Sequence, residues 1–424
     1  MKILHVQQTL ARRHGGPSTV LPQLAKAQTD AGHDVVIATT NADVPAGTYR
    51  DAGWDFIEGS SARVFYAPVQ FHPLKFSLGL LKYLWTSVRD FDVVHIHGVY
   101  RFPTTAAAFM CRWFKVPYII RPHGTLDPYA SNRSASGKLW IKRLYRRWFV
   151  VPSLNAASSI HYTAEREKER ARFLNLRSPS FIVPNGLDSD IYQSQPERGR
   201  LRERWGIDDA PLVLFLGRLD AIKGLDLLVQ AFDRVRRSEP NAHLVIAGPD
   251  NNGYGQEVRR WVSEHCLDKN VHIVGPLQGA DVKQAFVDAD IFVLISRTEN
   301  FGVTVVEAMA CGLPVVISDQ VGIHPEVSAN GAGLTTSCDA VEAANALTLL
   351  LGDPTRRSAM GQAGRELAEA HYSWPEIVKA LDGRYEAIIS GRDGDRGEES
   401  GRGLLNRKRP VDEESDTTDG HPVP

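Results

Sequence analysis

Short apolar runs alternate with helix-length amphipathic segments through most of this chain, and this alternation limits the folds that it can adopt. In the first half the apolar runs are KILHV at 2–6, DVVIATT at 34–40, DVVHIHG at 92–98, PYIIRPHG at 117–124, SIHYT at 159–163 and FIVPNG at 181–186. Such runs, separated by helical segments, are typical of parallel strands that are covered by helices on both faces. The first half therefore predicts a doubly wound α/β domain.

The same pattern restarts after a charged stretch around residues 193–209. Its strands are predicted at PLVLFLG (211–217), HLVIAG (243–248), VHIVG (271–275), IFVLIS (291–296) and PVVIS (314–318). A chain of 424 residues also exceeds what one hydrophobic core usually supports. We expect two doubly wound, Rossmann-like domains with parallel sheets, residues 1–195 and 196–373.

The end of the chain departs from this pattern. Residues 391–424 contain no aromatic residue and include GRDGDRGEESGRG and VDEESDTTDGHPVP. Such a composition cannot bury enough apolar surface to order itself. We predict a disordered tail, with binding of a partner as the alternative.

Charge and cysteine content exclude several classes of protein. The chain has 49 Lys and Arg against 50 Asp and Glu, so no net charge attracts nucleic acid. Its four cysteines are far apart and form neither a CxxC pair nor a zinc-ligand spacing. No secretory leader and no apolar run of about 20 residues is present. We expect a cytoplasmic protein without a metal centre.

In doubly wound sheets, ligands bind beyond the carboxyl ends of the strands. The predicted strand ends here carry polar residues or glycine, at His97-Gly98, His123-Gly124, Asn185-Gly186, Gly217-Arg218, Gly248, Gly275 and Ser296. We therefore place the chemistry at these strand ends.

Two carboxylates lie in the otherwise small and apolar stretch SRTENFGVTVVEAMACGLPVV. A helix that begins at Gly302 or Val303 would point its free N–H groups toward the strand ends and offer an anion site. Glu307 is the only charged side chain of that helix, and vicinal ligand hydroxyls would satisfy it. Glu299 precedes the helix, nearer the anion site. The alternative is that Glu307 binds a loop of its own protein and Glu299 is solvated.

Two cations occur in the stretch FLGRLDAIKGLDLLVQAF. Arg218 and Lys223 follow a predicted strand and open a helix, where positive charge opposes the helix dipole. An anionic ligand explains them, because Arg offers a planar fork and Lys a compact charge that together suit a diphosphate. Simple surface solvation is the alternative.

Three further segments are less specific. Gly15 and Gly16 form a turn that would let a ligand approach the backbone closely, although a structural turn fits as well. His123 lies at a strand end, where it could bind a polar substrate or serve the fold alone. The segment 138–149 interleaves Lys and Arg with aromatic and aliphatic residues, which suits docking on anionic lipid or simple solvation of a core helix.

Taken together, these motifs resemble the family 4 (group 1) retaining glycosyltransferases, which use nucleotide sugars and have the GT-B fold. The resemblance extends from Met1 to about Ser390. It depends on five motifs in order: GGP at 15–17, RPHGTLD at 121–127, PNGLD at 184–188, LGRLDAIKGLDLLVQAF at 216–232, and the E-x7-E segment followed by EAMACGLPVV.

The resemblance implies a role for each candidate residue. Arg218 and Lys223 would bind the donor diphosphate and stabilise the leaving group, Glu299 and His123 would lie near the transferred sugar, and Glu307 would hold the ribose. The remaining donor contacts would come from Gly16, Gly275, Asn300, Phe301, Gly302 and Val303. Asn300 stands where the family usually has glycine, and since Asn tolerates a left-handed backbone, we expect no loss of activity.

The resemblance also implies the reaction and the partners. The donor would be a nucleotide sugar and the acceptor a glycan or a lipid-linked glycan, used in cell-surface polysaccharide synthesis, without a metal or other cofactor. Helix 374–390 would cross back to the first domain, and 138–149 would contact the inner membrane surface. The alternatives are another GT-B enzyme, such as a sugar-nucleotide epimerase or sugar-phosphate synthase, and a non-catalytic protein that binds nucleotide sugars.

Overall fold

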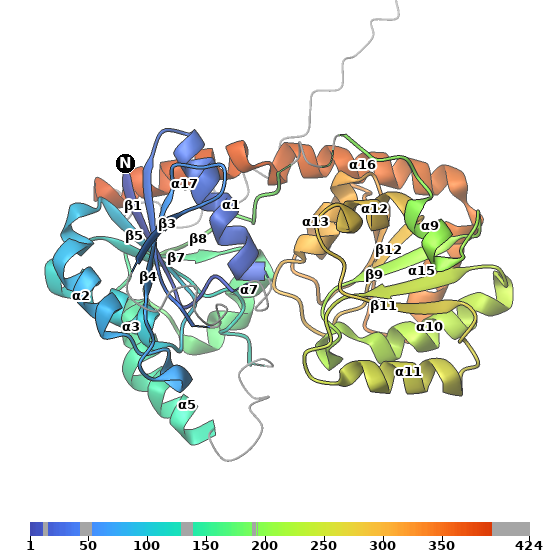
Figure 1. Ribbon diagram of the computed structural model, residues 1–424, viewed down its shortest axis with the longest axis horizontal. Helices are drawn as coiled ribbons and strands as arrows, with labels where there is room; N and C mark the ends of the chain where they lie inside the picture. The colour runs from blue at the N-terminus through green and yellow to red at the C-terminus, as the bar shows by residue number, and fades with distance from the viewer. Residues whose placement is uncertain (12–15, 43–52, 129–138, 189–191, 193, 392–424) are drawn as a thin grey trace, which may run out of the picture.

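The computed structural model contains two parallel-stranded α/β domains that lie side by side (Figure 1). It describes residues 1–11, 16–42, 53–128, 139–188, 192 and 194–391. The predicted disordered tail, 391–424, lies outside the described residues except for its first, as do Gly15 and Lys138. No helix of the described part of the chain is long and apolar enough to cross a membrane.

The first sheet has eight strands in the order β3-β4-β2-β1-β5-β6-β7-β8. The strands are β1 (Lys2–Gln7), β2 (Asp34–Thr40), β3 (Gly53–Phe56), β4 (Arg63–Ala67), β5 (Val93–His97), β6 (Tyr118–Arg121), β7 (Ser159–Tyr162) and β8 (Ser180–Ile182). Its helices are α1 (Gly16–Asp30), α2 (Leu78–Ser87), α3 (Phe102–Phe114), α5 (Leu139–Tyr145), a π-helical turn (Arg146–Val150), α6 (Val151–Asn155) and α7 (Glu165–Ala171).

The second sheet has six strands in the order β11-β10-β9-β12-β13-β14. The strands are β9 (Leu212–Leu216), β10 (His243–Ala247), β11 (Val271–Gly275), β12 (Ile291–Leu294), β13 (Val315–Ser318) and β14 (Gly333–Thr336). Its helices are α9 (Arg200–Trp205), α10 (Leu225–Ser238), α11 (Tyr254–Glu264), α12 (Ala280–Asp288), α13 (Val303–Ala310), α14 (His324–Ala329), α15 (Ala340–Gly352) and α16 (Pro354–Tyr372).

The predicted parallel sheets are confirmed, and one edge of the first sheet departs from the parallel arrangement. Strand β3 pairs antiparallel with β4, and only residues 57–62 connect them. A connection this short cannot hold the crossover that a parallel pair needs, so the strand returns antiparallel. Strands β3, β4 and β14 were not predicted from the sequence.

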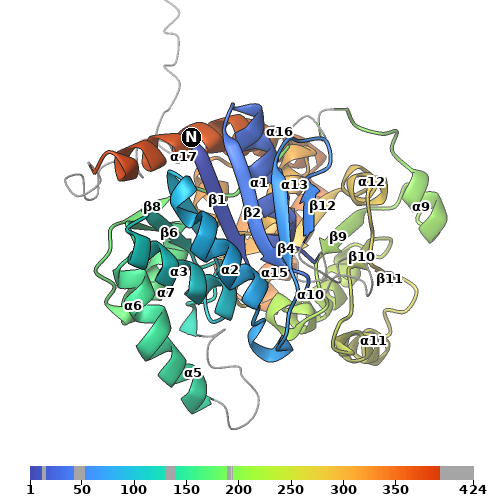
Figure 2. The ribbon, with the colours of Figure 1, turned by 60° about the vertical axis from the view of Figure 1, so that its left-hand side comes forward.

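Successive side chains of a strand point to opposite faces of the sheet, so the first domain has two apolar layers. Leu4 and Val6 face the layer that contains α2, α3 and α6, whereas Ile3 faces the layer beneath α1. The final helix α17 (Trp374–Ile389) also lies in this second layer, although it follows the second domain in sequence. Figure 2 shows α17 lying against the first domain beside α1 and β1.

The chain crosses between the domains at two adjacent segments. The backbone N–H of Leu187 donates to the carbonyl of Tyr372 over 2.6 Å. A Cβ added to Gly186 would lie 2.2 Å from the Trp374 ring, so only glycine fits against this indole. These contacts hold the outgoing and returning segments together.

Candidate active site

The carboxyl ends of the two sheets meet where one loop of the second domain contacts two loops of the first. Thr298, after β12, donates from its hydroxyl to a carboxylate oxygen of Asp127, after β6, over 2.7 Å. Asn300 donates from its side-chain amide to the hydroxyl of Thr163 over 2.8 Å. The segment 298–300, which contains Glu299, is therefore held directly against the first domain.

An ion pair of the first domain supports the same contact. Arg170 lies 2.7 Å from the Asp127 carboxylate and 3.1 Å from the side-chain oxygen of Gln320 in the second domain. It also contacts the hydroxyl of Thr298. This interdomain network could not be predicted from the sequence, because Arg170 is more than 100 residues from its partners Thr298 and Gln320 and only the fold brings them together.

Lys223 and Glu299 form an ion pair between two strand-end loops of the second domain. Their side chains are 16% and 20% exposed, so this pair is only partly screened by solvent. The two loops are joined nearby, where the backbone N–H of Arg297 donates to the carbonyl of Ile222 over 2.7 Å. Lys223 and Glu299, which belong to two separate motifs in the sequence, are thus direct partners.

Close backbone packing sets the positions of these loops. Gly224 has a φ of +67°, and a Cβ there would lie 2.0 Å from the carbonyl oxygen of Ile295. Gly248 has a φ of +149°, and a Cβ added to it would lie 1.8 Å from the carbonyl oxygen of Gly217. Arg218 directly follows Gly217 and is exposed, so its guanidinium is accessible at the end of β9.

Helix α13 begins at Val303, as predicted, after Gly302 with a φ of +99°. Glu307 projects from its second turn, and the hydroxyl of Tyr192 donates a hydrogen bond to this carboxylate. Desolvation raises the pKa of Glu307 to about 7 despite that bond. The carboxyl group is therefore protonated in part of the molecules at neutral pH. Tyr192 gave no signal in the sequence, since its segment has no regular pattern.

The remaining predicted donor contacts lie on three separate segments. Phe301 is buried and its ring packs edge-on against Tyr372, with centroids 5.7 Å apart. Gly275 ends β11 with a φ of +76°, and Gly16 is the exposed first residue of α1. Asn300, unlike Gly302, is not in the left-handed region, so the tolerance expected of Asn at that position is not needed.

His123 is held in the left-handed region, with a φ of +53°, at the end of β6. It is partly exposed, and its Nε2 lies 3.0 Å from Nδ1 of His97. The next residue, Gly124, is close to the second domain, since a Cβ there would lie 2.9 Å from Cβ of Asn300. His123 is thus placed beside the interdomain contact that holds Glu299.

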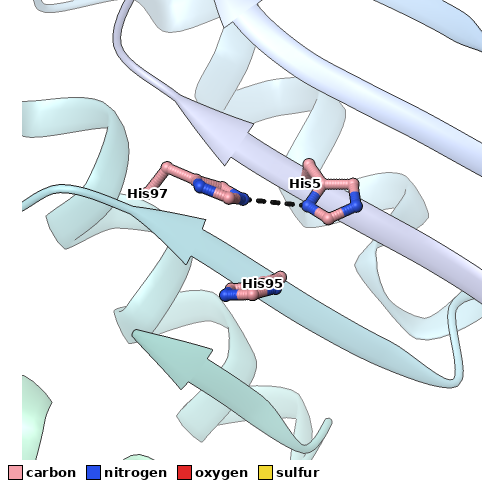
Figure 3. Close-up of side chains that lie close together, drawn as sticks. All are labelled: His5, His95 and His97. Carbon is pink, nitrogen blue, oxygen red and sulfur yellow. Dashed lines mark hydrogen bonds between the residues drawn. The ribbon is translucent and has the colours of Figure 1, made fainter. Parts of the chain in front are cut away.

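His123 contacts His97, which belongs to a group of buried histidines. Figure 3 shows three of them, His5, His95 and His97. One ring nitrogen from each of these three lies within 4.8 Å of the others, a spacing compatible with a metal ion. However, every ring nitrogen of the three already has a protein hydrogen-bond partner. Hydrogen bonding within the protein therefore accounts for the cluster. The signal that sequence analysis overlooked was histidine alternating with apolar residues in the strand VVHIH.

Two family models cover most of the chain. Residues 197–367 match the model described as "Glycosyl transferases group 1", and residues 15–186 match the "Glycosyl transferase 4-like domain". Each match covers the greater part of one of the two α/β domains, so the sequence of each half carries the family signal independently.

Curated relatives include two mannosyltransferases. The chain is 33% identical over 237 residues to the GDP-mannose-dependent alpha-(1-6)-phosphatidylinositol monomannoside mannosyltransferase of Mycolicibacterium smegmatis, covering 51% of this chain and 61% of that protein. It is 26% identical over 402 residues to the GDP-mannose:cellobiosyl-diphosphopolyprenol alpha-mannosyltransferase of Xanthomonas oryzae, covering 92% and 97%. The chain thus spans less than two thirds of the first of these relatives.

Solved structures share the complete two-domain architecture. Sucrose-phosphate synthase from Thermosynechococcus elongatus aligns with a TM-score of 0.71 at 23% identity, over 92% of this chain and all of that one. Anabaena HepE, solved in complex with UDP and glucose, aligns with a TM-score of 0.71 at 19% identity, over 91% and 100%. At these identities the likeness establishes the fold.

Proposed function

The chain belongs to the group 1 glycosyl transferases and has the GT-B fold, and from this premise we propose that it transfers a sugar from a nucleoside diphosphate sugar to a glycan or lipid-linked acceptor. One observation carries the proposal: Lys223 pairs with Glu299, whose loop is hydrogen-bonded to the His123–Asp127 loop of the other domain. A donor bound to the second domain would therefore present its sugar to the first.

The proposed chemistry is the departure of a nucleoside diphosphate from the sugar carbon. Arg218 and Lys223 supply positive charge where negative charge grows on the leaving oxygen. Glu299 orients the sugar and Lys223, and we propose that substitution occurs with retention of configuration. No metal ion is needed in this arrangement, since two cations and the start of α13 face the diphosphate.

We further propose how the donor lies in the site. Glu307 accepts hydrogen bonds from the ribose hydroxyls, and His123 lies at the sugar end. Backbone groups complete the site around the sugar, phosphates and base, and they belong to Gly16, Gly275, Asn300, Phe301, Gly302 and Val303. GDP-mannose is the first donor to test, because the relatives in M. smegmatis and X. oryzae are named for it.

Product analysis with nucleotide sugars tests this function. We expect the purified chain to release GDP from GDP-mannose fastest when a polyprenyl diphosphate-linked oligosaccharide is present, and to form an α-linked product. UDP- and ADP-sugars serve as the comparison. A product from the donor alone whose sugar is epimeric to that of the donor would indicate an epimerase, a phosphorylated disaccharide would indicate a synthase, and binding without turnover would indicate a non-catalytic protein.

Donor affinity should depend on pH through Glu307. Ribose hydroxyls bind the ionised carboxylate of Glu307 more tightly than its protonated form. Without a donor bound, the pKa of Glu307 is about 7. As pH falls below 7, binding must also remove a proton, so affinity should fall about tenfold per pH unit and level off above pH 7. Calorimetry with intact GDP-mannose measures this, because its diphosphate stays ionised over that range.

The matched variant for this measurement is Glu307→Gln. We expect weaker binding that no longer changes with pH, because the amide does not titrate. A wild-type affinity that is constant between pH 5.5 and 8, or a Gln variant that keeps the wild-type slope, would contradict the role given to Glu307.

We also propose that the basic helix docks on the inner surface of the cytoplasmic membrane, where a lipid-linked acceptor would be found. The helix from Leu139 to Val150 exposes Trp140, Ile141, Leu144, Trp148 and Phe149. Arg143 and Arg147 are exposed on the same helix. Large exposed apolar side chains combined with Arg are typical of helices that insert into an anionic interface.

Vesicle sedimentation tests the docking. Vesicles with 30 mol% anionic lipid should bind the chain roughly ten times more tightly than neutral vesicles, and the double change Trp140→Ser, Trp148→Ser should weaken binding to both kinds of vesicle. Leu349→Ser, at an exposed residue of α15, is the control. Equal binding to both kinds of vesicle would exclude this surface as a lipid contact.

A further inference from the structure

A continuous line of buried polar side chains runs behind His123. It comprises His5 on β1, His95 and His97 on β5, and His161 on β7, with Gln28 from α1 and Tyr385 from α17. All six lie in the layer between the sheet and these two helices, where the other side chains are largely apolar. Groups buried in such surroundings need hydrogen-bond partners within the protein.

The carbonyl of Val183 fixes the direction of the first bonds. Nε2 of His161 lies 2.7 Å from this oxygen, which can only accept, so Nε2 carries the proton. Burial lowers the pKa of His161 well below its ordinary value, so the ring is neutral and its Nδ1 accepts. Nδ1 of His161 therefore accepts from Nε2 of His95, 3.2 Å away, and Nδ1 of His95 accepts from the Tyr385 hydroxyl over 2.8 Å.

The same reasoning continues through α1 to the cleft. Tyr385 has given its proton to His95, so its oxygen accepts from the Gln28 amide over 3.3 Å. The amide oxygen of Gln28 then faces His5 and accepts from Nε2 over 2.7 Å. Nδ1 of His5 accepts from Nε2 of His97 over 2.9 Å, and Nδ1 of His97 accepts from Nε2 of His123 over 3.0 Å.

We propose that this relay, from the Val183 carbonyl through Gln28 to His97, holds His123 as the tautomer protonated on Nε2 and leaves its Nδ1 as a hydrogen-bond acceptor for a hydroxyl of the bound sugar. The proposal rests on the proposed transferase function for the identity of the ligand. Among the described residues, no other group bonds to the ring of His123. A neutral ring in this state accepts from a hydroxyl but cannot donate to a phosphate oxygen through Nδ1.

Gln28 is the positioning residue that sets the direction of the relay, because its amide has one donor end and one acceptor end. It is fully buried, and it joins the Tyr385 half of the relay to the His97 half. Reversing or removing this amide removes the acceptor that keeps the proton of His5 on Nε2. The effect passes through two rings to His123, which would then exchange between both tautomers.

Nitrogen NMR of the full chain with 15N-labelled histidine tests the relay without any substrate. We expect His5, His97 and His123 to be protonated on Nε2, with scalar couplings across the His123–His97 and His97–His5 hydrogen bonds. A His123 protonated on Nδ1, or absence of these couplings, would overturn the proposal. Addition of one equivalent of Co²⁺ should leave the signals of His5, His95 and His97 unbroadened, and stoichiometric broadening would indicate a metal site in place of the relay.

Two variants of Gln28 separate positioning from packing. Gln28→Leu should give mixed tautomers at His123 and lower kcat about tenfold, the cost of one misdirected hydrogen bond, with a smaller change in KM. Gln28→Glu keeps an acceptor for His5 and should restore the Nε2 tautomer and most of kcat. Gln23→Leu, the same substitution at an exposed position of α1, is the control.

The outcomes distinguish the relay from the proposed function. An unchanged His123 tautomer in Gln28→Leu, or an equal loss of kcat in Gln23→Leu, would overturn the relay. The wild-type tautomers decide the proposal even where a variant fails to fold. If the tautomers are as expected but no nucleotide sugar is transferred, the transferase function fails while the relay stands.

Discussion

Replacing Lys223 with alanine will lower kcat/KM for sugar transfer by about 100- to 1,000-fold, the usual effect of removing one group that stabilises a developing anion. Its ammonium lies in a partly buried ion pair with Glu299. The variant removes that positive charge and leaves the carboxylate of Glu299 without it, so both the leaving group and the sugar lose a stabilising partner. Initial rates at varied donor concentration measure the effect.

The control for this prediction is Lys379→Ala, at an exposed position of α17. It removes the same charge from the chain and should leave kcat/KM unchanged. Lys223→Met keeps the apolar stem of the side chain and should be as impaired as Lys223→Ala. Near-normal transfer by either Lys223 variant, with an unchanged melting temperature in both, would contradict the proposed donor site.

The local features of this site could be predicted because they depend on neighbouring residues. The start of α13 at Val303 follows from a strand, a short loop with Gly302 and a helical pattern, all within about 20 residues. The strand ends that carry Arg218, Gly275 and His123 follow from the alternation of apolar runs. The antiparallel β3 was missed because half of its four residues, Gly53 and Asp55, disfavour strands.

The contacts between distant segments could not be predicted from one sequence. His95 meets Tyr385 across 290 positions, and only the return of α17 to the first domain brings them together. Arg170 likewise meets Thr298 across 128 positions, and only the packing of the two domains brings them together. The sequence therefore indicated which residues carry charge, but not that Lys223 is already paired with Glu299. The donor diphosphate would have to share Lys223 with this carboxylate.

Gly224→Ala should lower both stability and transfer, because the loop of Lys223 touches the loop of Glu299 at this glycine. The new Cβ would lie 2.0 Å from the carbonyl oxygen of Ile295, a backbone atom of the residue that directly follows β12. The loops must therefore move apart, and a shift of this kind in a catalytic group costs about 100-fold in rate. We expect such a fall in kcat/KM and a loss of about 3 kcal/mol in unfolding free energy.

Gly206→Ala isolates the contribution of this close contact. Gly206 has a φ of +66°, nearly equal to the +67° of Gly224, but a Cβ there would meet nothing within 4 Å. Both variants place alanine in the left-handed region, which costs about 1 kcal/mol, whereas only Gly224→Ala forces the Lys223 and Glu299 loops apart. Denaturant unfolding and transfer rates should therefore separate the two variants, with full activity in Gly206→Ala. Equal losses in both would mean that backbone conformation, rather than the contact with Ile295, sets the position of Lys223.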